Sequence, residues 1–316
     1  MEFIKSPLNY TGNKYRILKQ IVPFFPKKIN CMMDLFCGGA TVGLNVEANK
    51  VIFVDSNERV INLLIYLSHQ NFEKFLSNIE KVITSYGLSY SYKYGYSRYR
   101  NYSKDKKDNN GLKEYNSVGY YKLRDDYNAL PNKDSDKANL LLYVLMVYAF
   151  NNDIRFNSDG DFNLPIGKTD LNARNIEKVR EYINRTKNIK TEFVCTSFDS
   201  PNFNELLKQV DFIYMDPPYL LGDAVYNSCW NNEMEHKLLD FIDRLIDNHI
   251  EFALSNVLTK VGKTNEPLSY WLHKNSNRVE VHHINYNYRS ASYNKITRDA
   301  NEEEILVCNK RYKNED

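Results

Sequence analysis

The sequence predicts an α/β fold, with a mostly parallel, Rossmann-like sheet interrupted by a mainly helical insert. The run Phe212–Met215 is short and apolar, as in a buried strand, and it stops where proline removes the ladder N–H. A second apolar run, at 32–37, leads into a glycine pair, and a third, VIFVD, ends at Asp55. The carboxyl ends of such strands meet at one edge of an open sheet, where these folds bind ligands.

Composition limits the class of protein. The 316 residues are 42% hydrophobic, enough for a large core, and the net charge of +2 confines any nucleic-acid contact to a local surface. The five cysteines are odd in number and form no CxxC pair, which indicates reduced thiols, a cytoplasmic protein and no structural zinc. The sequence has neither a membrane-spanning apolar run nor the apolar core of a signal peptide, so no membrane association is expected.

The N-terminal half carries the signs of a cofactor site. Residues 8–14, LNYTGNK, form a glycine turn before a short amphipathic helix, and residues 41–47 are expected to begin a helix after Gly38 and Gly39. Asp55 follows the glycines by about 20 residues, a spacing that suits the hydroxyls of a ribose. The glycines do not fit the dinucleotide pattern and no Walker lysine follows, so S-adenosylmethionine remains the preferred cofactor. A plain β-α-β unit with a capping acid is the alternative.

The segment DPPY, at 216–219, offers the groups that an aromatic amine needs. The Asp216 carboxylate and the Pro217 carbonyl are two acceptors for two N–H bonds, and Tyr219 offers a flat face for stacking. A polar turn after a core strand is the alternative interpretation.

Together these motifs resemble the Dam-like adenine-specific DNA methyltransferases, over nearly the whole chain. LNYTGNKYRIL, DLFCGGATVGLN, VDSN, DPPY and EFALSNV match the motifs of that family in its order, with Ala40 where many members have a second glycine. The resemblance implies catalysis at Asp216, Pro217 and Tyr219. It implies that S-adenosylmethionine is bound by Tyr10, Lys14, Phe36, Gly38, Asp55 and Asp216, and we expect Phe198 beside the adenine of the cofactor.

The implied chemistry is methylation of adenine N6 in double-stranded DNA. Two acceptors would polarise the amine, so catalysis needs positioning and electrostatics without a covalent enzyme intermediate. The base must leave the duplex to reach the site, and stacking on Tyr219 would offset part of the cost.

Residues 58–188 are predicted to form a target-recognition domain, and residues 1–57 with 189–316 a discontinuous catalytic domain. Helices are expected over 59–67, 72–83, 120–128 and 137–150, and a hairpin around Ser158, Asp159 and Gly160. The tyrosine-rich, basic segment at 86–102 suits phosphate tracking and base stacking, with a loop that contacts nothing as the alternative.

The resemblance also implies the residues that contact DNA. Arg155 falls where the family reads a guanine, and Phe150 and Asn151 fall where it wedges the base stack. Asn9 and Asp153 replace a lysine and a leucine that read bases in Dam itself, so a site other than GATC is expected. Arg289 lies in a basic loop expected on the DNA backbone.

The C-terminal part completes the sheet, with strands expected in EFALSN, RVEVHHINY and EEILVC and a helix over 233–249. His282 and His283 have no ligand partners nearby in the sequence, so no metal site is expected. The rival functions are a cytosine-N4 methyltransferase, a methyltransferase acting on RNA or protein amides, and a binding module without turnover. As a DNA methylase the protein would serve a restriction-modification system, beside a separate cognate endonuclease, or act as an orphan or phage enzyme.

Overall fold

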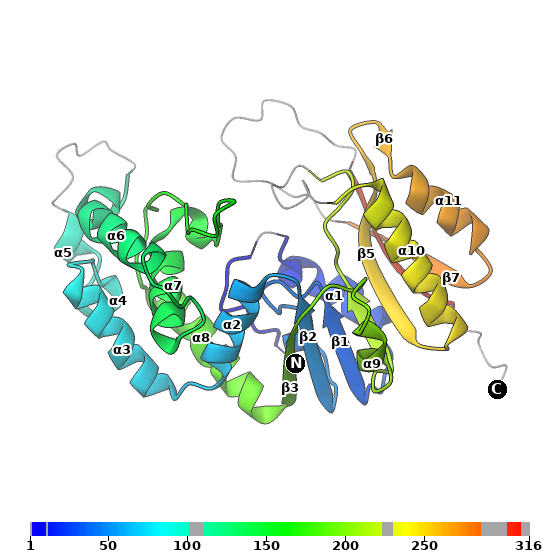
Figure 1. The fold of residues 1–316 in the computed structure, drawn as a ribbon, viewed down its shortest axis with the longest axis horizontal. Helices are drawn as coiled ribbons and strands as arrows, with labels where there is room; N and C mark the ends of the chain where they lie inside the picture. The colour runs from blue at the N-terminus through cyan, green and yellow to red at the C-terminus, as the bar shows by residue number, and fades with distance from the viewer. Residues whose placement is uncertain (1, 11, 101–109, 223–229, 286–301, 311–316) are drawn as a thin grey trace. The chain divides into compact units, whose positions relative to one another are not determined.

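The structure is a computed structural model that describes residues 2–10, 12–100, 110–222, 230–285 and 302–310 (Figure 1). The chain divides into two compact units, which are described separately below. Unit 1 comprises Met1–Asn13, Gly38–Asn45 and Asn57–Phe193; unit 2 comprises Lys14–Cys37, Val46–Ser56 and Val194–Asp316. The domain boundaries expected at 57/58 and 188/189 stay a prediction.

The strands form a sheet with the order β3-β2-β1-β4-β5-β8-β7, to which β6 is added beside β5, and all of them except the first four residues of β3 belong to unit 2. Strands β2, β1, β4 and β5 run parallel to one another in this order, and β8 runs antiparallel between β5 and β7. This arrangement confirms the predicted Rossmann-like sheet. The strands are β1 (Cys31–Leu35), β2 (Lys50–Asp55), β3 (Lys190–Cys195), β4 (Phe212–Met215), β5 (Glu251–Lys260), β6 (Lys263–Thr264), β7 (Val279–Ile284) and β8 (Glu302–Asn309).

One face of this sheet packs against two amphipathic helices, α10 (Asn232–Asp247) and α11 (Glu266–Lys274). In Figure 1, α10 lies across β5. Side chains alternate along a strand, so every second residue of the central strands faces these helices. The residues that share this core include Met33, Leu35, Ile213, Met215, Phe252, Leu254, Ile305 and Val307. This packing holds the carboxyl ends of β1, β2 and β4 in register.

The opposite face receives the short helical segment at the start of unit 2. It consists of η1 (Lys14–Ile17), α1 (Leu18–Ile21) and η2 (Val22–Phe24). The Phe25 ring lies 4.9 Å from that of Phe212 and 5.6 Å from that of Tyr214, centroid to centroid. The helix predicted here is present but short, because Pro23 begins a tighter turn.

The prediction of a helix over residues 41–47 is wrong. Only the 3-10 turn η3 (Gly43–Asn45) forms there. The Asn45 side chain donates to the carbonyls of Thr41 (2.8 Å) and Ile4 (2.9 Å) and accepts from the Ile4 amide (2.8 Å). Asparagine side chains that bind nearby backbone groups in this way compete with helical hydrogen bonds.

Unit 1 contains the helices of the insert. The described ones are α2 (Glu58–Ser68), α3 (Phe72–Ser85), α4 (Ser91–Tyr94), α5 (Ser97–Arg100), α6 (Lys113–Asn128), α7 (Asp136–Tyr148), η4 (Phe150–Asn152) and α8 (Ala173–Asn188). The four predicted helices are present, although α6 begins at Lys113, seven residues earlier than expected. Helix α8 and strand β3 were not predicted; a capping box between Asn172 and Asn175 starts α8.

The predicted hairpin is also present in unit 1. Phe156 and Phe162 form an antiparallel bridge, and the Asn157 amide donates to the Asp161 carbonyl at 2.9 Å. Gly160 has φ 79°, which glycine adopts readily at such a turn. Among the described residues, no helix combines the length and apolar character needed to cross a bilayer.

Candidate active site

Asp216 follows β4 at the carboxyl edge of the sheet, and both of its oxygens are engaged. The Lys14 ammonium lies 2.7 Å from Oδ2, and the Tyr219 hydroxyl donates to Oδ1 at 2.9 Å. Lys14 is only 3% exposed and Asp216 19% exposed, so this ion pair is largely shielded from water. Lys14 Nζ also lies 5.1 Å from the centre of the Tyr219 ring, a cation–π distance. The structure thus brings together three of the predicted site residues.

The structure adds a residue that no sequence motif indicates. The Tyr219 hydroxyl lies 3.4 Å from Oε1 of Glu304, a side chain of β8 that is 2% exposed. Glu304 is the third acid of the run EEE, which resembles an exposed strand end; the burial is a tertiary effect. Nothing in that run indicates which of the three carboxylates turns inward.

Acidic groups also surround Tyr214, which lies on β4 beneath the site. Its hydroxyl shares a 2.8 Å hydrogen bond with Ser255. Burial raises the pKa of Tyr214 well above its usual value, and Asp216, Asp34 and Glu304 raise it further. Tyr214 therefore stays neutral and contributes a hydrogen-bonding group rather than a charge.

In addition to Lys14, unit 2 contains four of the residues predicted to bind the cofactor: Phe36, Asp55, Phe198 and Asp216. Phe36 follows β1 with φ 64°, and its ring lies 5.6 Å from that of Phe198 and 5.7 Å from that of Trp230. Asp55 is the last residue of β2, and its carbonyl accepts from the Thr196 amide at 3.1 Å. An aromatic wall and a carboxylate at neighbouring strand ends suit an adenine ring and a ribose.

Cys37 follows Phe36 and is buried. Burial raises the pKa of its thiol well above the usual value, and the carboxylates of Asp55 and Asp34 raise it further. The thiol is therefore protonated at neutral pH and is not a nucleophile.

Tyr10 and Gly38, the other two predicted cofactor residues, meet in unit 1. A Cβ atom at Gly38 would lie 2.6 Å from Cδ1 of Tyr10, and Gly38 has φ 45°. The Tyr10 ring therefore packs directly on the glycine backbone, and no other residue fits without displacing it. Ala40, two residues on, has φ 63°, a left-handed conformation that favours glycine. The departure from the family pattern at Ala40 thus carries backbone strain.

The residues predicted to contact DNA form two groups in unit 1. In the first, the Asn9 side chain donates to the Asn151 carbonyl at 3.3 Å and accepts from the Lys178 ammonium. Burial, followed by Lys5 and Arg174, lowers the pKa of Lys178. Phe150, beside Asn151, is 48% exposed. Asn151 has φ 57°, so a strained turn presents the aromatic ring to solvent.

The second group lies on the hairpin. The Arg155 guanidinium donates to the Asn163 side chain at 2.8 Å and to the Asn163 carbonyl at 3.3 Å, which fixes its direction. The Asp153 carboxylate accepts from the Ile154 amide at 2.8 Å, so part of its capacity is used locally. Arg289 lies outside the described residues. The roles of all these residues toward DNA stay predictions.

The tyrosine-rich segment is folded rather than a loop where it is described. Ser89 and Ser91 bind the buried Asp170 carboxylate, which anchors the start of α4. Tyr92, Tyr94 and Tyr96 are between 42% and 47% exposed. The exposed tyrosine rings are therefore carried by a folded segment, and their role in DNA binding stays a prediction.

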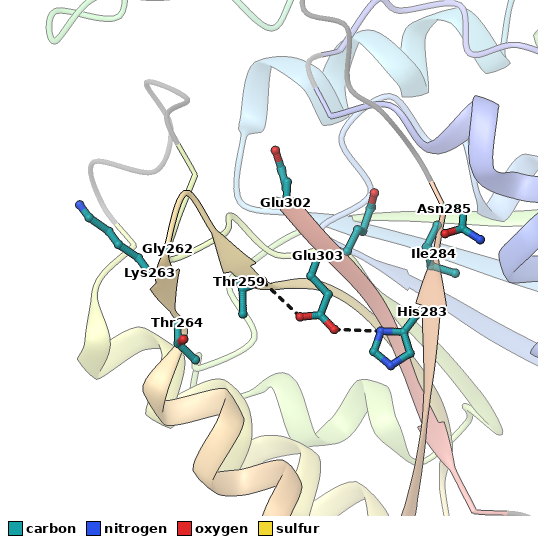
Figure 2. A pocket seen from close by; sticks show the side chains of 10 residues that line it. Thr259, Gly262, Lys263, Thr264, His283, Ile284, Asn285, Glu302 and Glu303 are labelled. Carbon is teal, nitrogen blue, oxygen red and sulfur yellow. Dashed lines mark hydrogen bonds and ion pairs between the residues drawn. The ribbon is translucent and has the colours of Figure 1, made fainter. Parts of the chain in front are cut away.

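A hollow of about 490 Å³ opens at the edge of the sheet formed by β5, β8 and β7 (Figure 2). Figure 2 shows Glu303 bridging two of its walls, because it accepts from Thr259 (3.1 Å) and pairs with His283 (2.9 Å). Glu304 belongs to the same lining. In the part of the chain that the structure describes, no three His, Cys, Asp or Glu side chains are grouped to hold a metal ion.

Comparisons with known proteins agree with this geometry. The sequence model of the D12 class N6 adenine-specific DNA methyltransferases matches residues 10–290. Type II methyltransferase M.FokI of Planomicrobium okeanokoites is 36% identical over 97% of this chain and 43% of its own length. Modification methylase StsI of Streptococcus sanguinis is 36% identical over 98% and 43%. DNA adenine methylase of Escherichia coli K12 is 23% identical over 79% of each chain. The chain thus spans less than half the length of the first two relatives.

Proposed function

The chain belongs to the D12 class N6 adenine-specific DNA methyltransferases, and from this premise we propose that it methylates adenine N6 at a specific site in double-stranded DNA. The observation that carries the proposal is the cluster of Lys14, Asp216 and Tyr219 at the carboxyl end of β4. Lys14 precedes Asp216 by 202 positions in the sequence, so a simple turn after β4 does not explain why the two side chains meet.

S-adenosylmethionine fits the residues present and would supply the methyl group as an electrophile. Asp55 would accept the ribose hydroxyls, and Phe36 and Phe198 would flank the adenine. Gly38 would serve the site through Tyr10, because it is buried directly beneath the Tyr10 ring and a side chain at position 38 would displace that ring. Lys14 would attract the cofactor carboxylate while it orients Asp216.

Asp216 and the Pro217 carbonyl would accept the two N–H bonds of the target amine. This pairing localises the nitrogen lone pair, which is otherwise delocalised into the ring. A carboxylate has about four lone-pair sites, so Asp216 can bind the amine while it keeps Lys14 and Tyr219. Tyr219, held by its hydroxyl, would stack on the flipped base.

We infer a restriction-modification role, with a recognition site other than GATC. Support for the role comes from relatives whose names describe modification methylases. Support for the specificity comes from Asn9 and Asp153, which stand where Dam carries base-reading residues. A cognate endonuclease acting separately, and a cytoplasmic place of action, belong to the same proposal.

The test is transfer of labelled methyl from S-adenosylmethionine to unmethylated DNA, followed by nucleoside analysis and sequencing of the modified positions. We expect N6-methyladenine at one short motif. Asp216→Ala should abolish transfer and retain DNA binding in a gel-shift assay. N4-methylcytosine, or label in RNA or protein only, would refute the proposed substrate.

A further inference from the structure

Glu304 occupies a buried position on β8 and reaches the candidate active site through one hydroxyl. Tyr219 OH lies 2.9 Å from Oδ1 of Asp216 and 3.4 Å from Oε1 of Glu304. A phenol carries a single proton, so it can donate to only one carboxylate at a time. The other contact is satisfied when that carboxylate itself carries a proton. The arrangement is therefore suited to passing a proton from one acid to the other.

The proposed reaction produces such a proton. When the N6 lone pair bonds to the methyl carbon, the nitrogen becomes positively charged, and an N6–H bond must break with its electron pair left on nitrogen. The Asp216 carboxylate is the base within reach of that amine in the proposed function. Lys14 lies 2.7 Å from Asp216, so the transferred proton arrives beside an existing positive charge. Repulsion between the two favours a further acceptor.

We propose that Glu304 is this further acceptor, and that the Tyr219 hydroxyl relays the proton from Asp216 to Glu304. The Asp216 O–H bond breaks as its proton moves to the Tyr219 oxygen, and the Tyr219 proton moves to Oε1 of Glu304. Tyr219 ends unchanged, Asp216 is again a carboxylate, and Glu304 is a neutral acid. The inference rests on the proposed function, because it needs the amine as the proton source.

The relay also needs an outlet to solvent, and we assign it to the hollow beside β8. Glu304 is 2% exposed and nevertheless belongs to the lining of this hollow. Glu303 and His283, which Figure 2 labels, belong to the same lining. Water there can receive the proton and reset Glu304 for the next turnover. Three groups of titratable or charged residues surround Glu304. Tyr219, Asp216 and Lys14 lie on the active-site side, and Tyr214 and Asp34 lie beneath. On β8 itself are Glu302, with Lys260 beside it, and Glu303, with His283 beside it.

The test compares Glu304→Gln with Glu304→Asp in single-turnover methyl transfer at saturating DNA and S-adenosylmethionine. Glutamine keeps the size but cannot take the proton, whereas aspartate is shorter but can. General-base steps contribute about 100-fold or more to rate, so we expect Glu304→Gln to lose about 100-fold in the rate constant. Glu304→Asp should recover part of that loss. A variant order with glutamine faster than aspartate, or a Glu304→Gln rate equal to wild type, would overturn the relay.

Tyr219→Phe tests the same route from the other side. It should lose a similar factor, and combined with Glu304→Gln it should lose no more than the larger single loss, since both remove one path. Full activity of Tyr219→Phe would also refute the relay. Glu303→Gln is the matched control, because the neighbouring acid contacts only Thr259 and His283 among the bonds described, and its rate should not change.

Binding and folding separate this inference from its premise. Calorimetric binding of S-adenosylmethionine, gel-shift binding of DNA and the melting temperature should be the same for Glu304→Gln and wild type. If wild type transfers no methyl to DNA, the proposed function fails and the relay with it. If wild type is active and Glu304→Gln matches it, only the relay fails.

Discussion

The Lys14–Asp216 ion pair allows a quantitative test of how unit 2 is assembled. Lys14→Met keeps the length and packing of a side chain that is 3% exposed but removes its charge. Losing one partner of a buried ion pair costs about 3–5 kcal/mol. Asp216 is 19% exposed and keeps the Tyr219 hydroxyl, so we expect a smaller loss of about 2–3 kcal/mol in the free energy of unfolding. Asp216→Asn, which removes the charge opposite Lys14, should cost about 3 kcal/mol.

The double variant Lys14→Met, Asp216→Asn distinguishes pairing from packing. With both charges gone, the loss should fall to about 1 kcal/mol, because replacing a whole buried pair is often nearly neutral. The coupling energy is then about 4–5 kcal/mol. Methyl transfer should be lost in all three variants. The double variant should therefore be nearly as stable as the wild type but inactive.

Urea unfolding followed by tryptophan fluorescence measures the free energy of unfolding of unit 2. Trp230 and Trp271, the two tryptophans of the chain, both belong to unit 2, which also contains the ion pair. Lys93→Met is the control: its ion pair with Glu80 is solvent-exposed and lies in unit 1, so its loss should leave the urea midpoint measured in unit 2 unchanged. Losses in the double variant that equal the sum of the single losses, within about 0.5 kcal/mol, would refute the coupling.

Three further predictions concern other parts of the chain. Gly38→Ala should abolish calorimetric binding of S-adenosylmethionine, because the added Cβ would lie 2.6 Å from the Tyr10 ring; a more stable Gly38→Ala variant would contradict this packing. Ala40→Gly should raise the free energy of unfolding by about 1 kcal/mol, because glycine adopts φ 63° without strain. Cys195 is exposed and should react with iodoacetamide in the native protein, while the raised pKa of Cys37 keeps its thiol protonated as pH rises past the usual thiol range; mass spectrometry that finds Cys37 modified first would be the contrary result. Asn163→Ala should release the Arg155 guanidinium and reduce discrimination between cognate and substituted sites by about 1–3 kcal/mol in competition binding, with unchanged discrimination as the contrary outcome.

The sequence determined the strands and the edge at which the site lies. Phe212–Met215 is apolar throughout and is followed by Asp216, and Lys50–Asp55 has four buried apolar residues between its terminal lysine and aspartate. Such apolar runs are typical of buried parallel strands. DPPY, the glycine pair and Asp55 could therefore be assigned to strand ends, and their types indicated an amine substrate and an adenosine cofactor. Local propensity failed at residues 41–47, where the Asn45 side chain binds the backbone of Ile4, a contact that no local pattern contains.

Only the tertiary structure decided which polar side chains meet. Lys14 and Asp216, or Tyr219 and Glu304, are joined because the sheet brings the ends of distant strands together, and pairing energy depends on distance and burial rather than on sequence separation. The same holds for Asn9, which lies against Asn151 and Lys178. Of the acids at 302–304, strand alternation and a bulge in the β5–β8 pairing leave Glu304 as the buried one, and its place beside Tyr219 follows from that register.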